Sequence, residues 1–393
     1  MSLLTYQKPS LPLSSVSYGP EYIYSLNLLS STQAIASLSD RSLRIFDLTR
    51  SRDGGSIKET SKILNAHVKN ISGVSVLADQ PNIVASSAED GIVKVWDLRS
   101  TKAVASMSCG SPLLSLAYSP LTNTIAAGTE LVSQDAKVVL FDVRSPASPL
   151  RTYADSHNDD VTVLAFHPTT RHSLLSAGTD ALITRYDTSI ADEDEAVAQV
   201  IHNGASVHLT GFLPGVDDAI FAASHIETWS VHKQTNKDDE SEDESMQRKE
   251  YGDVRESWGC EYIIDVNTQS GYVAVGSNTT SKLALIQLDS STGEVLPTSR
   301  IECDGAHANE VVRCACVNET YGLMLSGGED GVVKTWQITS SDPEVPEVDE
   351  GGWSEKKSKK SKKHHGSHGS HGDRKDKKDH DKKKDKSRRF KPY

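Results

Sequence analysis

Long hydrophobic runs are missing from this 393-residue chain, and no stretch approaches the ~18 apolar residues that a membrane-spanning helix needs. The segment from Met1 to Pro9 also lacks the apolar core of a signal peptide. The five cysteines are an odd number without a paired framework, which suits a reducing compartment. These absences argue against a membrane protein and a disulfide-framed secreted protein, and they predict a soluble intracellular protein.

Signatures of catalysis and of cofactor binding are also absent. The chain has no Gly-rich phosphate-binding loop and no metal-ligand spacing. Cys314 and Cys316 stand at strand-alternation spacing, and no second cysteine pair completes a zinc site. We therefore predict no enzymatic activity, no cofactor and no metal site.

One spacing of polar and aromatic residues recurs three times. A histidine is followed by Ser, Asp and an aromatic residue at offsets of 19, 23 and 29 residues. In such a set the aromatic residue can donate, Ser can bridge, His can relay and Asp can accept. Three regularly spaced copies favour a structural network over Ser-His-Asp catalysis. The sets are His67, Ser86, Asp90 and Trp96; His157, Ser176, Asp180 and Tyr186; and His307, Ser326, Asp330 and Trp336.

This pattern resembles the structural tetrad of the WD-repeat β-propellers, which have four strands per blade and a period of about 40–45 residues. The resemblance implies an all-β fold, a seven-bladed WD40-type β-propeller over residues 1–340. Leu3 to Tyr18 would supply the outer strand of the last blade and so close the ring. We place the closing residues of the blades at Phe46, Trp96, Phe141, Tyr186, Trp229, Ile286 and Trp336.

Charge divides the chain into a body and a tail. The net charge is −12; residues 355–393 hold 17 basic and 6 acidic side chains, net +11, which leaves −23 for residues 1–354. Segments this polar cannot bury enough apolar surface to fold alone. We predict a disordered acidic loop at 235–252, an acidic linker at 341–354 and a disordered Lys/His-rich basic tail at 355–393.

Three short motifs lie in these polar segments. Ser241 precedes Glu-Asp-Glu, a pattern typical of acidophilic kinase sites. A lysine cluster of the kind that nuclear importers bind comprises Lys356, Lys357, Lys359, Lys360, Lys362 and Lys363. A possible docking peptide, or alternatively only the end of a basic tail, contains Arg388, Arg389, Phe390, Pro392 and Tyr393.

The resemblance implies a rigid, non-catalytic platform that binds other proteins. Two functions stay open. The first is a nuclear or nucleolar scaffold, with a cytoplasmic fraction, whose acidic propeller binds a basic protein client and whose tail contacts RNA weakly. The second is a substrate receptor of a cullin-RING ubiquitin ligase, because Asp97 with Arg99 and Asp142 with Arg144 resemble paired WDxR adaptor-docking boxes. In either case we expect a monomeric propeller.

Overall fold

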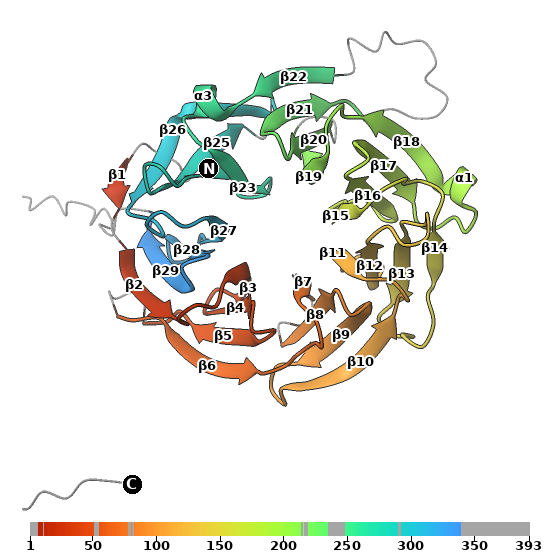
Figure 1. Cartoon of the computed structure of the whole chain (residues 1–393), viewed down its shortest axis with the longest axis horizontal. Coiled ribbons are helices and arrows are strands. Elements are labelled where there is room, and N and C mark those ends of the chain that lie inside the picture. Colours follow the sequence, from red (N-terminus) through yellow and green to blue (C-terminus); the bar gives the residue numbers. More distant parts are fainter. Residues whose placement is uncertain are drawn as a thin grey trace, which may run out of the picture. The chain divides into compact units, whose positions relative to one another are not determined.

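The computed structural model describes residues 7–338 except 11, 51–54, 78–79, 81, 214, 216–218, 235–247 and 290–291. The described residues form seven sheets that succeed one another around a ring (Figure 1). This arrangement confirms the seven-bladed β-propeller. No helix among the described residues is long and apolar enough to cross a membrane. The predicted linker and tail lie outside the described residues.

Each blade is an antiparallel sheet that starts at the centre of the ring and ends at its rim. Blade one comprises β3 (Ile23–Ser30), β4 (Gln33–Leu38), β5 (Leu43–Asp47) and β6 (Lys58–Ile63). Blade two comprises β7 (Ile71–Val76), β8 (Ile83–Ala88), β9 (Ile92–Asp97) and β10 (Lys102–Ser108). Blade three comprises β11 (Leu113–Ser119), β12 (Thr124–Thr129), β13 (Val138–Asp142) and β14 (Arg151–Tyr153). Blades four and five comprise β15 (Val161–Phe166), β16 (Ser173–Gly178), β17 (Leu182–Asp187) and β18 (Val197–His202), then β19 (Val207–Leu213), β20 (Ala219–Ser224), β21 (Thr228–His232) and β22 (Arg248–Asp253). Blade six comprises β23 (Tyr262–Asn267), β24 (Tyr272–Ser277), β25 (Lys282–Asp289), β26 (Glu294–Asp304) and β1 (Gln7–Ser10); blade seven comprises β27 (Val312–Asn318), β28 (Leu323–Gly328), β29 (Val332–Gln337) and β2 (Pro12–Ser17). Two short helices, α1 (Glu193–Ala196) and α3 (Arg255–Trp258), lie in connections.

The second strand of each blade is the most deeply buried. All six residues of β12, β16, β20, β24 and β28 are buried, because neighbouring blades cover both faces of each strand. Their sequences are accordingly rich in Ala, Ile, Leu and Val with few large polar residues. The fourth strands lie at the rim and are more exposed, as β10 shows with one buried residue, Met107.

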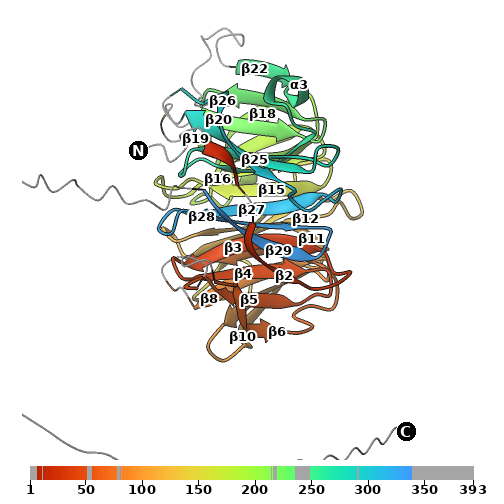
Figure 2. The ribbon, with the colours of Figure 1, turned by 90° about the vertical axis from the view of Figure 1, so that its left-hand side faces the viewer.

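The ring closes through the N-terminal segment. β2 pairs antiparallel with β29, so Pro12–Ser17 complete the last blade (Figure 2). This confirms the predicted closure, although the pairing is confined to Pro12–Ser17. β1 instead pairs parallel with β26 in blade six, which the sequence did not indicate. One short segment therefore joins two blades.

The closing residue of blade five was predicted wrongly. In blade two, Val84 is the second residue of β8 and pairs with Trp96. Ile220 is the second residue of β20 and pairs with His232. The register thus places His232 at the closing position, three residues after Trp229. Hydrophobic pattern favoured the tryptophan because it is by far the more apolar residue.

The predicted disordered loop 235–252 also extends too far. Residues 235–247 lie outside the described residues, but Arg248–Gly252 belong to β22, the outer strand of blade five. Only one edge of this strand is paired and most of its side chains face solvent. An outer strand therefore needs no apolar alternation, and its composition resembles that of a loop.

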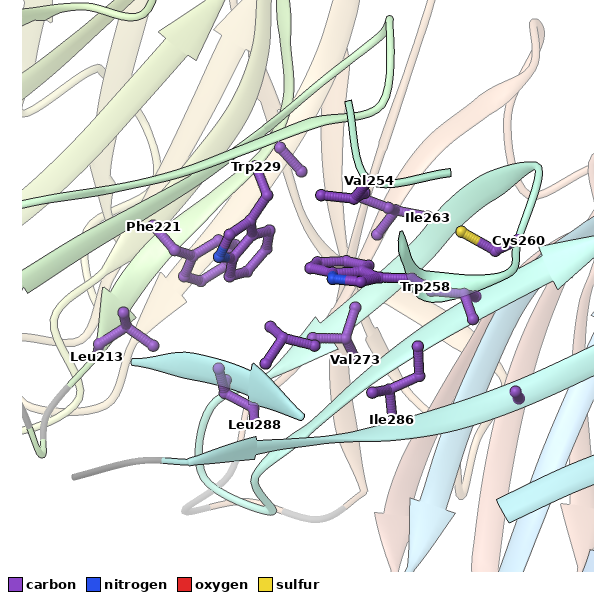
Figure 3. Close-up of a cluster of buried hydrophobic side chains, with 14 of the residues drawn as sticks. Leu213, Phe221, Trp229, Val254, Trp258, Cys260, Ile263, Val273, Ile286 and Leu288 are labelled. Carbon is purple, nitrogen blue, oxygen red and sulfur yellow. The ribbon is translucent and has the colours of Figure 1, made fainter. Parts of the chain in front are cut away.

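Aromatic packing joins blades five and six. Trp229 stacks on Phe221 with ring centroids 5.1 Å apart, and Trp258 from α3 lies 5.5 Å from Trp229 (Figure 3). Val273 and Ile286 of blade six complete the cluster. Because the three aromatic rings are almost fully buried, this contact compensates for the absence of a tetrad in blade five.

Candidate functional site

Each complete tetrad forms a continuous hydrogen-bonded chain. In blade two, Trp96 Nε1 donates to Ser86 Oγ at 2.9 Å, and Ser86 Oγ lies 2.7 Å from His67 Nε2. His67 Nδ1 lies 3.1 Å from Asp90 Oδ2. The carboxylate also accepts from the backbone N–H of Val68. The chain therefore ties the third strand, the second strand and two connecting loops to one another.

Blades four and seven repeat this geometry. In blade seven, the distances from Ser326 Oγ to His307 Nε2 and to Trp336 Nε1 are both 2.8 Å. His307 Nδ1 lies 2.7 Å from Asp330. In blade four the corresponding bonds link His157, Ser176 and Asp180, and the Tyr186 hydroxyl replaces the indole at 3.2 Å from Ser176 Oγ.

Because the tetrads are buried, their role is structural. The three histidines are only 2%, 3% and 0% exposed, so no substrate reaches a Ser-His-Asp arrangement without unfolding its blade. Burial alone would raise the pKa of Asp180 and of Asp330, but the bonds from histidine and backbone amides outweigh it and hold each pKa below its usual value. The charged carboxylate is thus stabilised where it is needed as an acceptor.

The tetrads lie on one face of the ring, which we call the tetrad face. It carries the loops that lead into each first strand and the turns between second and third strands. Around the inner strands on this face stands a ring of carboxylates, which we call the acidic collar. Its members are Glu89, Glu130, Asp160, Glu261 and Glu329.

Backbone hydrogen bonds fix the collar beside the innermost strands. The N–H of Glu89 donates to Asn70 O, one residue before β7, and the N–H of Glu130 donates to Pro112 O, one residue before β11. Asp160 and Glu261 directly precede β15 and β23. The collar residues therefore come from two connections that lead into first strands and from three turns between second and third strands.

Most of this negative charge is not neutralised by the fold. Glu329 pairs with Arg313. The other four collar carboxylates form no ion pair with any residue that the structure describes. Their hydrogen bonds are to neutral groups: Asn70 Nδ2 donates to Glu89, and the backbone N–H of Asn278 donates to Glu261. Such a surface attracts cations.

A cavity of about 310 Å³ lies inside the ring below the collar. It is lined by the second to fourth residues of the inner strands, and all seven blades contribute to it. The charged residues in the lining are Asp265 and Arg313. Burial raises the pKa of Asp265 to about 6, against a smaller opposing effect of the hydrogen bond from Val266 N.

The candidate adaptor-docking residues lie on the face opposite the tetrads, where third strands end. Arg99 forms a two-bonded fork with Asp97, and Arg144 forms the same fork with Asp142. The two arginine side chains are 70% and 68% exposed. The structure adds a third fork, between Arg255 and Asp253, in the chain after β22. Each fork closes its own turn, so the Asp-x-Arg spacing has a local role.

The remaining sequence candidates lie outside the described residues: Ser241, the lysine cluster at 356–363 and the peptide at 388–393. Within the described part of the chain, no group of three or more His, Cys, Asp and Glu side chains is arranged to hold a metal ion. The acidic collar and Asp265 were not predicted as a site. The sequence offered one indication of the collar: Glu89 and Glu329 each stand one residue before a tetrad aspartate.

Comparison with known proteins agrees with this geometry. The sequence model of the "WD domain, G-beta repeat" matches residues 58–97, 147–187 and 299–337, each of which ends beside a tetrad aromatic residue. A WD repeat-containing protein of Saccharomyces cerevisiae is 34% identical over 323 residues, covering 80% of this chain and 78% of the relative. The chain belongs to the WD repeat family.

Two further relatives are less similar to this WD repeat chain. The Dictyostelium discoideum "WD repeat-containing protein 89 homolog" is 24% identical, covering 91% of this chain and 94% of the relative. The Candida glabrata "Histone acetyltransferase type B subunit 2" is 29% identical over 172 residues, covering 43% of this chain and 39% of the relative. Propellers of the WD repeat family generally act as non-catalytic scaffolds that bind other proteins.

Replacing a tetrad aspartate should destabilise the fold. Asp90→Ala, Asp180→Ala and Asp330→Ala each remove the charged acceptor of a buried histidine, so we expect a loss of about 1.5–3 kcal/mol in the free energy of unfolding. Asp135→Ala, on the same face but at an exposed carboxylate that pairs with Lys137, is the control and should change little. Chemical denaturation measures both. A tetrad variant as stable as the control would show that its network contributes nothing.

Burial of neutral histidine should make stability depend on pH. Burial lowers the pKa of His232 to about 4, and Arg248 adds to the effect. The unfolded chain takes up a proton near pH 6.5 and the folded chain does not, so His232 removes stability as pH falls below about 6.5. Between pH 7.5 and pH 5 this amounts to at most about 2 kcal/mol.

Comparison with His232→Gln isolates the pH dependence of stability that His232 causes. The titration of Asp265 changes stability in the opposite direction, and it is common to both proteins. The free energy of unfolding of the variant should fall less than that of the wild type over the same pH interval. Parallel pH profiles for the two proteins would contradict the assignment.

Proposed function

We propose that this protein is a non-catalytic nuclear scaffold that binds a basic protein client on its tetrad face. The observation that carries the proposal is the acidic collar, whose carboxylates surround the central cavity and mostly lack cationic partners in the described fold. The predicted net charge of −23 for residues 1–354 acts in the same direction. Such a body repels nucleic acid and attracts basic proteins.

Rigid placement makes the collar suitable for recognition. Glu261 accepts from the backbone N–H groups of Asn278 and Thr279, and Asp160 accepts from the N–H of Leu131. Carboxylates held in this way do not have to be ordered when a client binds, so less conformational entropy is lost. Complementary charge raises the rate of association and selects among partners.

One partial relative supports the choice of client. The Candida glabrata relative is named as a subunit of a histone acetyltransferase, and histones are strongly basic proteins. The similarity covers less than half of each chain, so it bears on the class of client and not on its identity.

A second candidate function is that of an adaptor-bound ubiquitin-ligase receptor. The forks at Arg99 and Arg144 favour it, because they present exposed guanidinium groups at the ends of third strands in consecutive blades. The same geometry at Arg255 in another connection shows that the fork also forms for local reasons. We therefore rank the basic-client scaffold first.

Neutralising the collar should weaken binding of a basic ligand. For the triple variant Glu89→Gln, Glu130→Gln, Glu261→Gln we expect about tenfold weaker binding of an octalysine peptide, since each exposed ion pair contributes up to about 1 kcal/mol. The control removes three carboxylates that do not belong to the collar: Asp194→Asn, Glu195→Gln, Glu319→Gln. Calorimetric titration in low salt compares them.

Equal affinities of the two triple variants for octalysine would contradict a role of the collar in binding. Affinity purification from cells then separates the two functions. Loss of basic nuclear proteins in the collar variant supports the scaffold. Loss of a ligase adaptor in an Arg99→Ala, Arg144→Ala variant would instead support the receptor.

Nuclear accumulation should require the tail. The segment from Lys356 to Lys363 holds six lysines in eight residues, the composition that nuclear importers recognise. We expect a fluorescent fusion truncated after Ser354 to spread between nucleus and cytoplasm, whereas a fusion that ends at Lys363 should accumulate in the nucleus. A truncated fusion that still concentrates in the nucleus would contradict the role of the tail.

A further inference from the structure

The cavity inside the ring contains a carboxylate for which the described fold provides no counter-ion. Asp265 lies on β23 and lines the cavity. Its Oδ1 accepts from the adjacent Val266 N at 2.8 Å, and no described Lys, Arg or His forms an ion pair with it. A carboxylate in such surroundings costs folding free energy unless a cation or donors satisfy it.

Propeller architecture does not require a carboxylate at this position. Every inner strand has a register irregularity near its start, and Asp265 is the residue that resumes pairing after it in blade six. The residues at the same point in the other blades are all uncharged: Ser25, Gly73, Ser115, Val163, Leu209 and Cys314. Some of these serve local packing, since Ser115 Oγ donates to Val161 O in the next blade. Asp265 has no such bond across blades.

A second unsatisfied polar group belongs to the same lining. His208 of β19 lines the cavity, and its Nδ1 is buried without a hydrogen-bond partner in the described structure. Burial, with a smaller contribution from His225, lowers the pKa of His208 and keeps its ring neutral. The carboxylate of Asp265 offers acceptors to an N–H donor that enters the cavity. The hydroxyls of Ser72 and Thr162 also line the cavity.

The cationic residue already in the lining does not fill this role. Arg313 donates to Glu329 of the collar through its Nε and Nη2, and its side chain is 48% exposed. It is therefore held at the mouth of the cavity by a different carboxylate. A volume of about 310 Å³ lies at the lower end of the range for small-molecule sites, which suits one side chain better than a folded segment.

We propose that the cavity receives one cationic side chain, arginine or lysine, from the basic client and that Asp265 is its counter-ion. This inference rests on the proposed function and adds a specific subsite to it. The collar attracts the basic segment, and the buried carboxylate selects a single long cationic side chain that reaches past the collar. A charge pair removed from water is more selective than the exposed pairs around it.

The test uses the full chain, Asp265→Asn and two small cationic probes, Nα-acetyl-arginine amide and Nα-acetyl-lysine amide. Nα-acetyl-citrulline amide is the neutral control. We expect at least one cationic probe to bind, with citrulline at least tenfold weaker. Asp265→Asn should lose at least tenfold in affinity for the cationic probe. Titrations followed by NMR at millimolar probe concentration detect binding of this strength.

Thermal unfolding separates a binding role from a structural one. Because Asp265→Asn removes an unpaired, partly buried charge, we expect its Tm to be unchanged or higher at pH 7.5. A variant with a lowered Tm and unchanged affinity for the probes would overturn the inference and make Asp265 structural.

The octalysine titration separates this subsite from the scaffold function. If the collar variant weakens octalysine binding but no cationic probe distinguishes wild type from Asp265→Asn, the subsite is wrong and the acidic face stands. If octalysine does not bind the wild type at all, the proposed function fails as well.

Discussion

The fold depends on the tetrad aspartate, because this one carboxylate connects parts of a blade that are far apart in the sequence. Asp90 contacts His67, accepts from the N–H of Val68 in the incoming loop and accepts from the N–H of Ile92 in its own turn. Three of the seven blades have this arrangement. The others depend on packing against their neighbours, and blade five does so through stacked aromatic rings. Charge-assisted bonds and apolar burial thus alternate around one ring.

Much of this architecture was predictable, because repetition is a stronger signal than composition. Three sets at identical spacing identified the tetrads, and the seven regularly spaced closing residues predicted the number of blades. The hydrophobic pattern gave wrong predictions in blade five, where an outer strand is exposed and a polar residue takes the closing position. β22 has mostly exposed polar residues and was taken as part of a loop, and His232 was passed over for the more apolar Trp229. β1 is only four residues long, too short for any periodicity to predict it.

The candidate site was less predictable for a geometric reason. The collar residues are scattered along the chain and come together only in the fold. Glu89, Glu130 and Glu329 each follow a second strand, whereas Asp160 and Glu261 each precede a first strand on the same face. Asp265 is a single charge within an apolar strand, and its sequence context does not distinguish a solvent-facing residue from a cavity-facing one. The strand register distinguishes Asp265, since it aligns this residue with six uncharged residues in the other blades. Only the strand pairing therefore shows that a charge at Asp265 is unusual among the seven blades.

The pairing of one N-terminal segment with two terminal blades has a consequence for synthesis on the ribosome. β2 needs β29, and β1 needs β26, so the first residues to emerge must wait until roughly three hundred more have been made. At about 5–20 residues per second the wait is on the order of tens of seconds. During that time the partly built array exposes unpaired strand edges, which recruit other chains. The ring therefore becomes safe from misassociation only after β29 has been made, and a chain interrupted before β29 has no closed form available to it.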